Sequence, residues 1–246
     1  MISIKKNKTI QLDIPSFSCD KNIVGEHMEK HDVLKHMNSY AFNVVIGKPA
    51  SGKTSLAISL ITQRKPSIFR KCFHHVLIVM PQNSINSMNK NPFQKLPKEN
   101  FYNELDNESI TDIYNRLDGY SKDDEKSLLF IDDQTASLKG SKHIMETLSR
   151  IIFNRRHLKT NIILTAQVYN SLPLSIRKCI SNLIMFKPSK KEMENVFEEL
   201  IQSKKNLFDK IMNVCYDKPH NFMFVNMDSQ RIYKNWDEIL INDDDE

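Results

Sequence analysis

Only four cysteines occur in this chain of 246 residues, and they lie far apart. The chain therefore holds no CxxC pair and no group of cysteines and histidines at the spacing of metal ligands. That absence excludes the common zinc modules, and it indicates an intracellular chain whose thiols stay reduced. The four residues are Cys19, Cys72, Cys179 and Cys215.

Long apolar segments are absent as well. Residues 1–8 contain no apolar core of an export signal, and no later run reaches the roughly 18 apolar residues of a membrane span. We therefore expect a soluble protein that is not exported. With 40% hydrophobic residues, the chain is still long enough for one α/β domain with a substantial core, alone or with a small appendage.

The net charge is +5 and the pI is near 8.9, although the chain ends in the acidic run Asn242–Glu246. The rest of the chain is consequently more basic than the total. This balance favours a polyanionic partner, but a modest excess of lysine is also typical of an ordinary solvated surface. Charge alone leaves both interpretations open.

Short apolar runs alternate with helical patterns over about residues 42–186. The runs are apolar almost throughout and do not alternate, as expected of strands buried on both faces of a parallel sheet. We predict a doubly wound α/β sheet of about five strands, mostly parallel and flanked by helices. The expected strands are Phe42–Ile46, Val76–Met80, Leu128–Ile131, Ile162–Thr165 and Leu183–Phe186. The expected helices are Ser51–Gln63, Glu108–Asp118 and Ser141–Arg156.

Other segments lack this alternation. Residues 82–107 are rich in Asn, Lys and Pro, which predicts a surface excursion on the sheet. Two amphipathic helices and a β-hairpin are expected near the C-terminus. The helices are Lys190–Lys204 and Asn206–Cys215, and the hairpin strands are Phe222–Met227 and Arg231–Trp236. The predicted organisation is an N-terminal extension (1–38), a core (39–188), C-terminal helices and hairpin (189–241) and an acidic disordered tail (242–246).

Residues 47–54 are GKPASGKT, which matches the phosphate-loop pattern G-x-x-x-x-G-K-[ST]. An apolar strand is expected directly before them and a helix directly after, which is the context that the motif requires. Because the chain has only five glycines, a chance match has a probability on the order of one in a thousand. The motif therefore predicts a nucleotide site.

The residue types of this loop suit phosphate binding. Gly47 and Gly52 let the backbone turn tightly and point NH groups at phosphate oxygens, and the helix dipole adds to the attraction. Lys53 would reach the β- and γ-phosphates, and the Thr54 hydroxyl would bind Mg²⁺. Pro49 removes one backbone NH at a position that need not donate, so we expect little loss of affinity. The expected nucleotide-binding residues are Gly47, Lys48, Pro49, Ala50, Ser51, Gly52, Lys53, Thr54 and Ser55.

A pair of aspartates follows the apolar run Leu128–Ile131. P-loop enzymes use a carboxylate at the end of a neighbouring strand to hold Mg²⁺, and Asp132 is the candidate. Asp133 stands where many such ATPases carry the residue that orients and deprotonates the attacking water. Aspartates also commonly end strands for structural reasons, so the pair depends on the phosphate loop for its interpretation.

Polar residues flank the run Ile162–Thr165 on both sides. Gln167 follows it, where an amide can hydrogen-bond the γ-phosphate or the lytic water, although an ordinary loop glutamine is the alternative. Arg155 and Arg156 precede it. An arginine can neutralise charge on the transferring phosphoryl group, in many ring ATPases from the adjoining subunit. A solvated or DNA-facing basic pair is the alternative here.

The segments GKPASGKTS, LLFIDDQ, RRHLKTNIILTAQ and SLPLSIRKCISNLIMF together resemble the genome-packaging ATPases of nucleocytoplasmic large DNA viruses, the poxvirus-type branch of the HerA/FtsK superfamily. The resemblance covers about residues 39–186 and, more loosely, the chain as far as Trp236. It implies a P-loop NTPase fold with ATP and Mg²⁺ as cofactors. It also implies that Asp132 binds metal, Asp133 is catalytic and Gln167 is a polar sensor. Arg156 would be the trans-acting arginine, a role that Arg155 could exchange with it.

The same resemblance implies ATP-driven movement of double-stranded DNA into a capsid by a homo-oligomeric ring, hexameric or pentameric, that works with capsid or portal components. The implied location is the host cytoplasm, in the viral factory, with the virion as a second place. DNA contacts should go to the backbone without reading bases. Candidates are Lys90, Lys95, Lys98 and the segment Ser137–Lys142. Because no carboxylate cluster on strand ends follows Phe186, we expect a motor that does not cut DNA.

Two other functions remain open at this point. One is a DNA helicase or pump of the cellular HerA/FtsK type, which would usually carry a membrane anchor or an extra DNA-binding module. The other is an ATP-regulated assembly scaffold, in which turnover is incidental. Asp133 and Gln167 discriminate between the motor and the scaffold, because a protein that only binds ATP needs neither a base nor a sensor.

Overall fold

The computed structural model describes residues 37, 40–64, 69–86, 88, 91–201 and 205–240, with only the backbone of residues 205–207. The predicted N-terminal extension, apart from residue 37, and the predicted acidic tail lie outside the described residues. So do Cys19 and Lys90, which the sequence analysis singled out.

One sheet of nine strands runs through the described part of the chain, in the order β3-β2-β4-β5-β1-β6-β7-β8-β9. The strands from β3 to β6 are parallel to one another, and the last three join in antiparallel fashion. The strands are β1 (Phe42–Ile46), β2 (His75–Val79), β3 (Phe101–Tyr102), β4 (Ser127–Ile131), β5 (Thr160–Ala166), β6 (Asn182–Phe186), β7 (Phe222–Asn226), β8 (Arg231–Lys234) and β9 (Asp237–Glu238).

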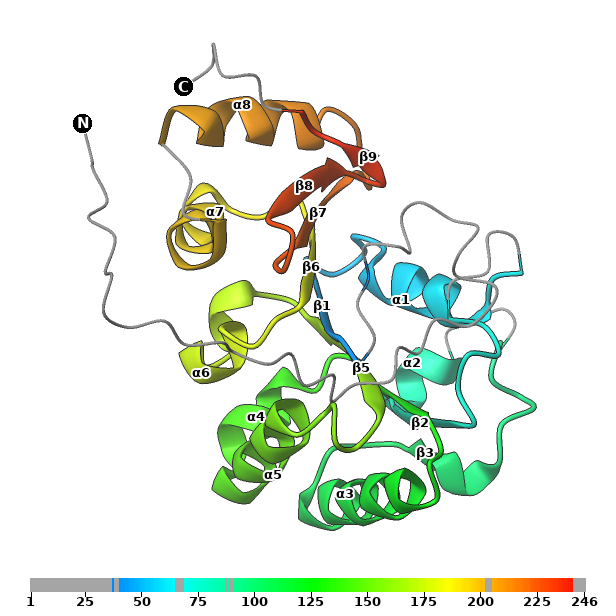
Figure 1. Ribbon diagram of the computed structural model, residues 1–246. Coiled ribbons are helices and arrows are strands. Elements are labelled where there is room, and N and C mark those ends of the chain that lie inside the picture. The colour runs from blue at the N-terminus through cyan, green and yellow to red at the C-terminus, as the bar shows by residue number, and fades with distance from the viewer. Residues whose placement is uncertain are drawn as a thin grey trace, which may run out of the picture.

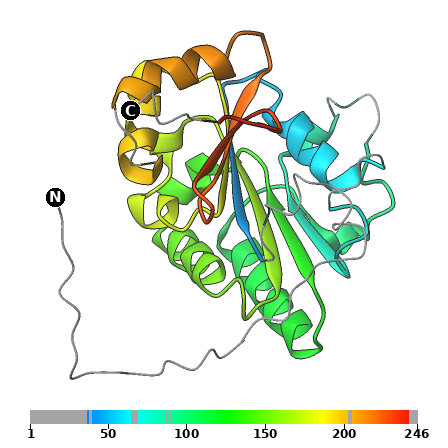
Figure 2. The same ribbon diagram turned by 45° about the horizontal axis from the view of Figure 1, so that its top comes forward.

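Helices cover both faces of this sheet (Figure 1). α1 lies on one face, and α3, α4, α5, α6 and α7 lie on the other, as the view in Figure 2 also shows. The helices are α1 (Lys53–Thr62), α2 (Gln82–Asn86), α3 (Asn107–Lys122), α4 (Thr135–Gly140), α5 (Lys142–Phe153), α6 (Leu174–Arg177), α7 (Lys190–Val196) and α8 (Lys205–Cys215). Short helical turns are η2 (Lys98–Asn100), η3 (Tyr169–Ser171) and the π-helical turn η4 (Phe197–Ile201).

Two hydrophobic clusters correspond to the two faces. Ile113 of α3, Leu148 of α5 and Val196 of α7 belong to the larger cluster, whereas Ala57 and Leu60 of α1 belong to the other. All five residues of β1 and β4, and all seven of β5, are buried. Burial on both faces explains why these strands are mostly apolar and do not alternate.

The expected α/β architecture is confirmed, and each of the five predicted strands is present within two residues of its expected ends. The predicted number of strands was too low. β3 comes from the supposed surface excursion and pairs with β2, and the predicted C-terminal hairpin continues the same sheet by pairing β7 with β6. A two-residue strand and an antiparallel edge carry too little sequence periodicity to reveal this.

Two predicted helices are shorter than expected. The helix predicted over Ser141–Arg156 begins with Ser141 as its N-cap, whose hydroxyl accepts a hydrogen bond from Ile144 N, but it ends at Phe153. The helix predicted over Lys190–Lys204 gives way to the π-helical turn after Val196.

Among the described residues, no helix combines the length and the apolar character that a membrane span demands.

The arrangement of parallel strands positions the site. β1, β2, β4, β5 and β6 run in the same direction, so their carboxyl ends lie at one edge of the sheet. β5 lies between β1 and β4, with Ile46 opposite Ala166 and Ile131 opposite Leu164. Ligands of open α/β sheets bind at this edge, and each motif of the sequence analysis except the arginine pair follows one of these strand ends.

Candidate functional site

The phosphate loop connects β1 to α1 and is held in a compact turn. Gly47 N donates to the carbonyl of Ala166, the last residue of β5, at 3.1 Å. Ser51 N donates to the Lys48 carbonyl at 3.2 Å, and both Ala50 and Gly52 have positive φ, of 61° and 100°. The loop is thereby tied to the end of the neighbouring strand.

Both glycines of the loop are required by this geometry. A Cβ on Gly47 would lie 2.3 Å from Ser51 Oγ and 3.1 Å from the Phe186 side chain, which packs beneath the loop. Gly52 has a left-handed backbone conformation, in which a side chain would be strained. The two glycines therefore permit a close turn that directs backbone NH groups toward one point.

The loop also holds polar groups that lack a partner of their own. Lys53 is 7% exposed, and its ammonium makes no hydrogen bond or salt bridge with any described residue. Ser51 Oγ is buried, and the described part of the chain offers it no hydrogen-bond partner. Burying a cation and a hydroxyl in this way is unfavourable unless a ligand completes them. Both groups suit a phosphate, at the amino end of a ten-residue helix.

Asp132 connects the acidic strand to the phosphate loop. Its Oδ1 accepts a hydrogen bond of 2.9 Å from the Thr54 hydroxyl and one of 2.6 Å from the Thr165 hydroxyl. Burial raises the pKa of this carboxyl, while the hydroxyls of Thr165 and Thr54 and the charge of Lys53 oppose the rise. A cation bound beside Asp132 would favour its ionised form.

Asp133 and Gln167 form the next contact. Nε2 of Gln167 donates to both carboxylate oxygens of Asp133, at 2.9 and 3.2 Å. The backbone of Asp133 has a φ of 51°, and its NH donates to the Thr165 hydroxyl at 3.0 Å. A left-handed conformation is uncommon for a residue other than glycine, and such residues are frequent at active sites.

The residues at this edge fit Mg²⁺ by their donor chemistry. Mg²⁺ prefers oxygen ligands and usually takes only one or two carboxylates, with waters and phosphate oxygens completing its shell. The Thr54 hydroxyl and the Asp132 carboxylate are adjacent oxygens of this kind. Within the described ranges, no group of three or more His, Cys, Asp and Glu side chains could form an all-protein metal cage.

The arginine pair lies away from this edge. Arg155 and Arg156 precede the first residue of β5, whereas Gln167 follows its last residue. Seven extended residues span about 20 Å, which exceeds the reach of an arginine side chain. The Arg155 guanidinium donates to the Ile152 carbonyl at 3.0 Å, while Arg156 is exposed. Neither arginine can therefore act on the phosphate loop of its own chain, and Arg156 is the more accessible of the two.

The candidate DNA contacts are placed differently from one another. Lys95 is exposed on the turn that follows α2, and Lys98 is exposed in η2. The segment Ser137–Lys142 runs from α4 into α5 and begins four residues after Asp133. Both of its lysines, Lys139 and Lys142, are exposed.

Three residues near the motifs escaped the sequence analysis. Thr165 joins Asp132 to Asp133, and its signal was a polar side chain in the otherwise apolar run that leads to Gln167. Phe186 packs against the phosphate loop, but an apolar residue at the end of a strand does not stand out in the sequence. His220 hydrogen-bonds the Ser51 carbonyl through Nδ1 at 3.1 Å across 169 residues of sequence, which no local pattern could reveal.

A hollow of about 440 Å³ adjoins the phosphate loop on the side of β6. Its walls come from the loop itself, from the end of β6 and from the turn between α8 and β7. The lining residues are Lys48–Ser51, Phe186, Lys187 and Tyr216–Asn221.

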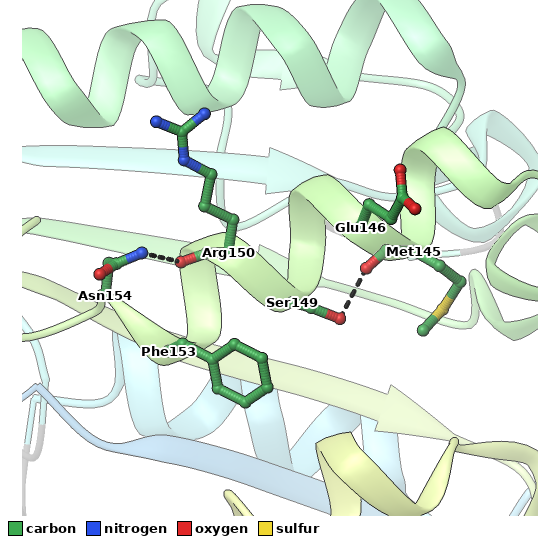
Figure 3. Close-up of a pocket in the computed structure, with 6 residues that line it drawn as sticks. All are labelled: Met145, Glu146, Ser149, Arg150, Phe153 and Asn154. Carbon is green, nitrogen blue, oxygen red and sulfur yellow. Dashed lines mark hydrogen bonds between the residues drawn. The ribbon is translucent and has the colours of Figure 1, made fainter.

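A second hollow, of about 370 Å³, lies along the outer side of α5 (Figure 3). Met145 and Phe153 give it an apolar lining, beside the polar side chains of Glu146, Ser149 and Arg150. Phe153 is 55% exposed, which is unusual for a phenylalanine. This hollow is close in sequence to the arginine pair and distant from the phosphate loop.

Comparison with known proteins supports a viral relationship. The family model described as "Poxvirus A32 protein" matches residues 28–245 of the chain. No individually curated protein matches it.

Solved structures with a similar fold include B204, the DNA-packaging ATPase from Sulfolobus turreted icosahedral virus, with a TM-score of 0.61 at 18% identity over 84% of this chain and 100% of that one. The genome-packaging NTPase B204 from Sulfolobus turreted icosahedral virus 2, in complex with ATP-γS, gives 0.56 at 18% identity over 83% and 100%. EssC (ATPases 2 and 3) from Geobacillus thermodenitrificans gives 0.53 at 12% identity over 80% and 39%. At these identities, the likeness concerns the fold.

Proposed function

The chain belongs to the poxvirus A32 protein family, and from that premise we propose that it is an ATPase that packages viral DNA by translocating the duplex into a capsid. The observation that carries the proposal is a continuous set of hydrogen bonds from Thr54 through Asp132 and Thr165 to Asp133 and Gln167. This set connects the phosphate loop to a candidate base and a candidate sensor. A site that only binds nucleotide requires neither.

ATP would lie with its β- and γ-phosphates against the backbone NH groups of the loop. The buried ammonium of Lys53 and the buried hydroxyl of Ser51, which has no hydrogen-bond partner among the described residues, would donate to phosphate oxygens. Thr54 and Asp132 would hold Mg²⁺, which neutralises the developing negative charge on the phosphates. Their mutual hydrogen bond keeps both oxygens in place.

The hollow beside the loop would take the adenosine part of the nucleotide. It begins at Lys48–Ser51 of the phosphate loop, and it is large enough for a base and a ribose. Phe186 and Pro219 supply apolar surface, and His220 is fixed to the loop through the Ser51 carbonyl. The turn at Tyr216–Asn221 would thus contact the part of ATP that does not react.

Hydrolysis would depend on Asp133. Its carboxyl group stands just beyond β4 and accepts hydrogen bonds from Gln167 at both oxygens, which hold it in position. It would orient a water for attack on the γ-phosphate and accept its proton. Gln167 can donate either to Asp133 or to a phosphate oxygen, and it would exchange one partner for the other when the γ-phosphate arrives or leaves.

A ring of identical subunits would complete the site. Arg156 is exposed at the edge of the sheet opposite the phosphate loop, so the γ-phosphate it could neutralise belongs to another subunit. Phe153, which is exposed on the hollow of Figure 3, lies three residues earlier. An exposed apolar side chain beside such an arginine suits burial against a second copy of the chain.

The test is ATP hydrolysis by the purified full chain with and without double-stranded DNA at low salt, where phosphate contacts are strongest. We expect turnover to be stimulated by DNA, abolished by Lys53→Ala and abolished by Arg156→Ala. Mixing the two inactive variants should restore activity, because each can supply what the other lacks. Arg231→Ala, which changes another arginine of the chain, serves as the control and should retain wild-type turnover.

Other outcomes would overturn parts of the proposal. If neither DNA nor Arg156→Ala changed the rate of ATP hydrolysis, the packaging motor would be refuted and the protein would be an ATPase of another kind. Binding of ATP with no turnover in any assembly would favour the ATP-regulated scaffold. Strand separation by the purified protein would favour the helicase alternative.

A further inference from the structure

A buried tyrosine follows the sensor by two residues. Gln167 and Val168 are exposed, and Tyr169 is completely buried, with none of its surface accessible. It is the largest of the fully buried side chains among the described residues. Only Val168 therefore separates Gln167, which contacts Asp133, from Tyr169, which is buried in the core.

Two carboxylates of the C-terminal segment hold Tyr169. Glu192, in the first turn of α7, accepts a hydrogen bond from the Tyr169 backbone NH. Glu199, in the π-helical turn, accepts one from the Tyr169 hydroxyl at 2.9 Å. Burial, followed by the hydrogen bond to Glu199, raises the pKa of Tyr169, which keeps its hydroxyl protonated as the donor.

Arg177 completes this cluster. Its Nη2 lies 2.9 Å from the second oxygen of Glu199, its Cζ lies 4.9 Å from the centre of the Tyr169 ring, and its Nη1 donates to Asn170 at 2.9 Å. The side chains of Arg177 and Glu199 are only 12% and 24% exposed. A partly buried ion pair of this kind holds the Glu199 carboxylate in a defined orientation beside the Tyr169 hydroxyl.

The position of Glu199 is itself unusual. It lies in a π-helical turn, Phe197–Ile201, which interrupts the helix begun by α7. Such turns are rare, and they occur frequently at functional sites. Here the wider turn places the Glu199 carboxylate against the hydroxyl of Tyr169, two residues after Gln167.

We propose that Tyr169, Glu192 and Glu199 are positioning residues that link Gln167 to the α7 and π-turn segment. This linkage rests on the proposed sensing role of Gln167. When Gln167 moves from Asp133 to a phosphate, the short connection through Val168 transmits the displacement to Tyr169. The two carboxylates pass it to the segment 190–201. In return, the same contacts hold Gln167 at the correct distance from Asp133.

The experiment compares Tyr169→Phe with Tyr102→Phe in the full chain. Tyr102 is only partly buried, in the edge strand β3, but its hydroxyl makes similar contacts: it donates to Asp112 at 2.5 Å and accepts from Arg116 at 2.9 Å. Amide hydrogen exchange of peptides from 190–201 is measured with and without ATP-γS. We expect added protection in the wild type and in Tyr102→Phe, and none in Tyr169→Phe.

Turnover gives the second measurement. We expect Tyr169→Phe to lower DNA-stimulated kcat about tenfold without changing KM for ATP, because the hydrogen bond that is lost, from the Tyr169 hydroxyl to Glu199, positions Gln167 and does not contact the nucleotide. Glu192→Gln keeps an oxygen that can accept from Tyr169 and should keep the exchange response. Glu192→Met has no such oxygen and should lose the response.

Gln167→Ala separates the linkage from the sensor. If Gln167→Ala abolishes the exchange response while Tyr169→Phe preserves it, the sensor stands and the linkage is refuted. If the response survives Gln167→Ala, the sensing role fails and the linkage fails with it. Equal losses in Tyr169→Phe and Tyr102→Phe would also refute the linkage, since a general loosening of the fold would then explain both.

Discussion

The Thr54 hydroxyl donates a hydrogen bond of 2.9 Å to Oδ1 of Asp132, although β5 separates β1 and β4, the strands that precede these two residues. The contact joins the helix that begins at the phosphate loop to the end of β4. Thr165 of β5 lies between them and donates to the same oxygen at 2.6 Å. Two motifs separated by 78 residues are thus joined at one carboxylate. The surroundings of Asp132 determine both its ability to bind a metal ion and its effect on the free energy of unfolding.

The first prediction is that Asp132→Asn abolishes ATP hydrolysis but makes the fold more stable. An amide oxygen can still accept from Thr54 and Thr165, but it is a poor ligand for Mg²⁺, so Mg²⁺-dependent hydrolysis should be lost. Removing a buried charge should raise the melting temperature of the metal-free protein by about 2–4 °C, corresponding to roughly 1 kcal/mol. Calorimetry and an ATPase assay check the two effects. Unchanged turnover would remove Asp132 from the metal site.

The pH dependence of stability follows from the same carboxyl. Its folded-state pKa is raised by burial, so the fold disfavours the ionised form. In the metal-free wild type, the contribution of Asp132 to the free energy of unfolding should therefore increase as the pH falls through that raised pKa toward the ordinary aspartate value. Asp132→Asn should lack this contribution. Urea titrations of both proteins at a series of pH values measure the difference, and parallel curves would contradict it.

The second prediction concerns the amide of Gln167. Gln167→Glu places a carboxylate against both oxygens of Asp133, where two negative charges repel each other and shift the acceptor away from the water. We expect kcat to fall by at least about tenfold, with KM for ATP changed less than twofold. Steady-state kinetics with excess Mg²⁺ provide the measurement. A change confined to KM would place Gln167 in binding instead of catalysis.

The parts of the fold that could be predicted are those with strong local patterns. The strands at Phe42–Ile46, before Asp132 and before Gln167 are mostly apolar and do not alternate, and burial on both faces of a parallel sheet produces that pattern. The phosphate loop was identifiable because its glycines and Lys53 follow from backbone geometry and charge. The roles assigned to the site residues remain predictions, although the structure brings Thr54, Asp132, Asp133 and Gln167 together.

The parts that could not be predicted depend on contacts between distant segments. β3 has only two residues, and it is a strand only through its parallel pairing with β2. The π-helical turn differs from an α-helix by a single register shift, to which hydrophobic periodicity is insensitive. His220 and Glu199 are each an ordinary polar residue in sequence, and only the folded chain places them against Ser51 and Tyr169.

The third prediction tests the hollow beside the phosphate loop. His220→Ala should raise KM for ATP by about fivefold to tenfold through lost contact with the nucleoside, while kcat stays within about twofold. Inorganic tripolyphosphate, which has no base, should bind both proteins equally in a competition assay. His143→Ala, which changes a histidine on α5 that contacts Thr111, is the control. If tripolyphosphate binding falls as much as ATP binding, His220 supports the loop through the Ser51 carbonyl and does not line a nucleoside site.

The last prediction concerns subunit contact. Phe153 is 55% exposed at the end of α5, three residues before Arg156, so a subunit interface that delivers Arg156 should bury it. Phe153→Asp adds a charge that such an interface cannot solvate, and it should weaken assembly in sedimentation by about tenfold or more. Val214→Asp, at a side chain that is 47% exposed on α8, is the matched control and should assemble normally. DNA-stimulated turnover should fall with assembly in Phe153→Asp and recover at high protein concentration, because mass action restores the interface. A variant that assembles normally yet loses turnover would place Phe153 in contact with DNA or with another partner, and the interface would then have to lie elsewhere.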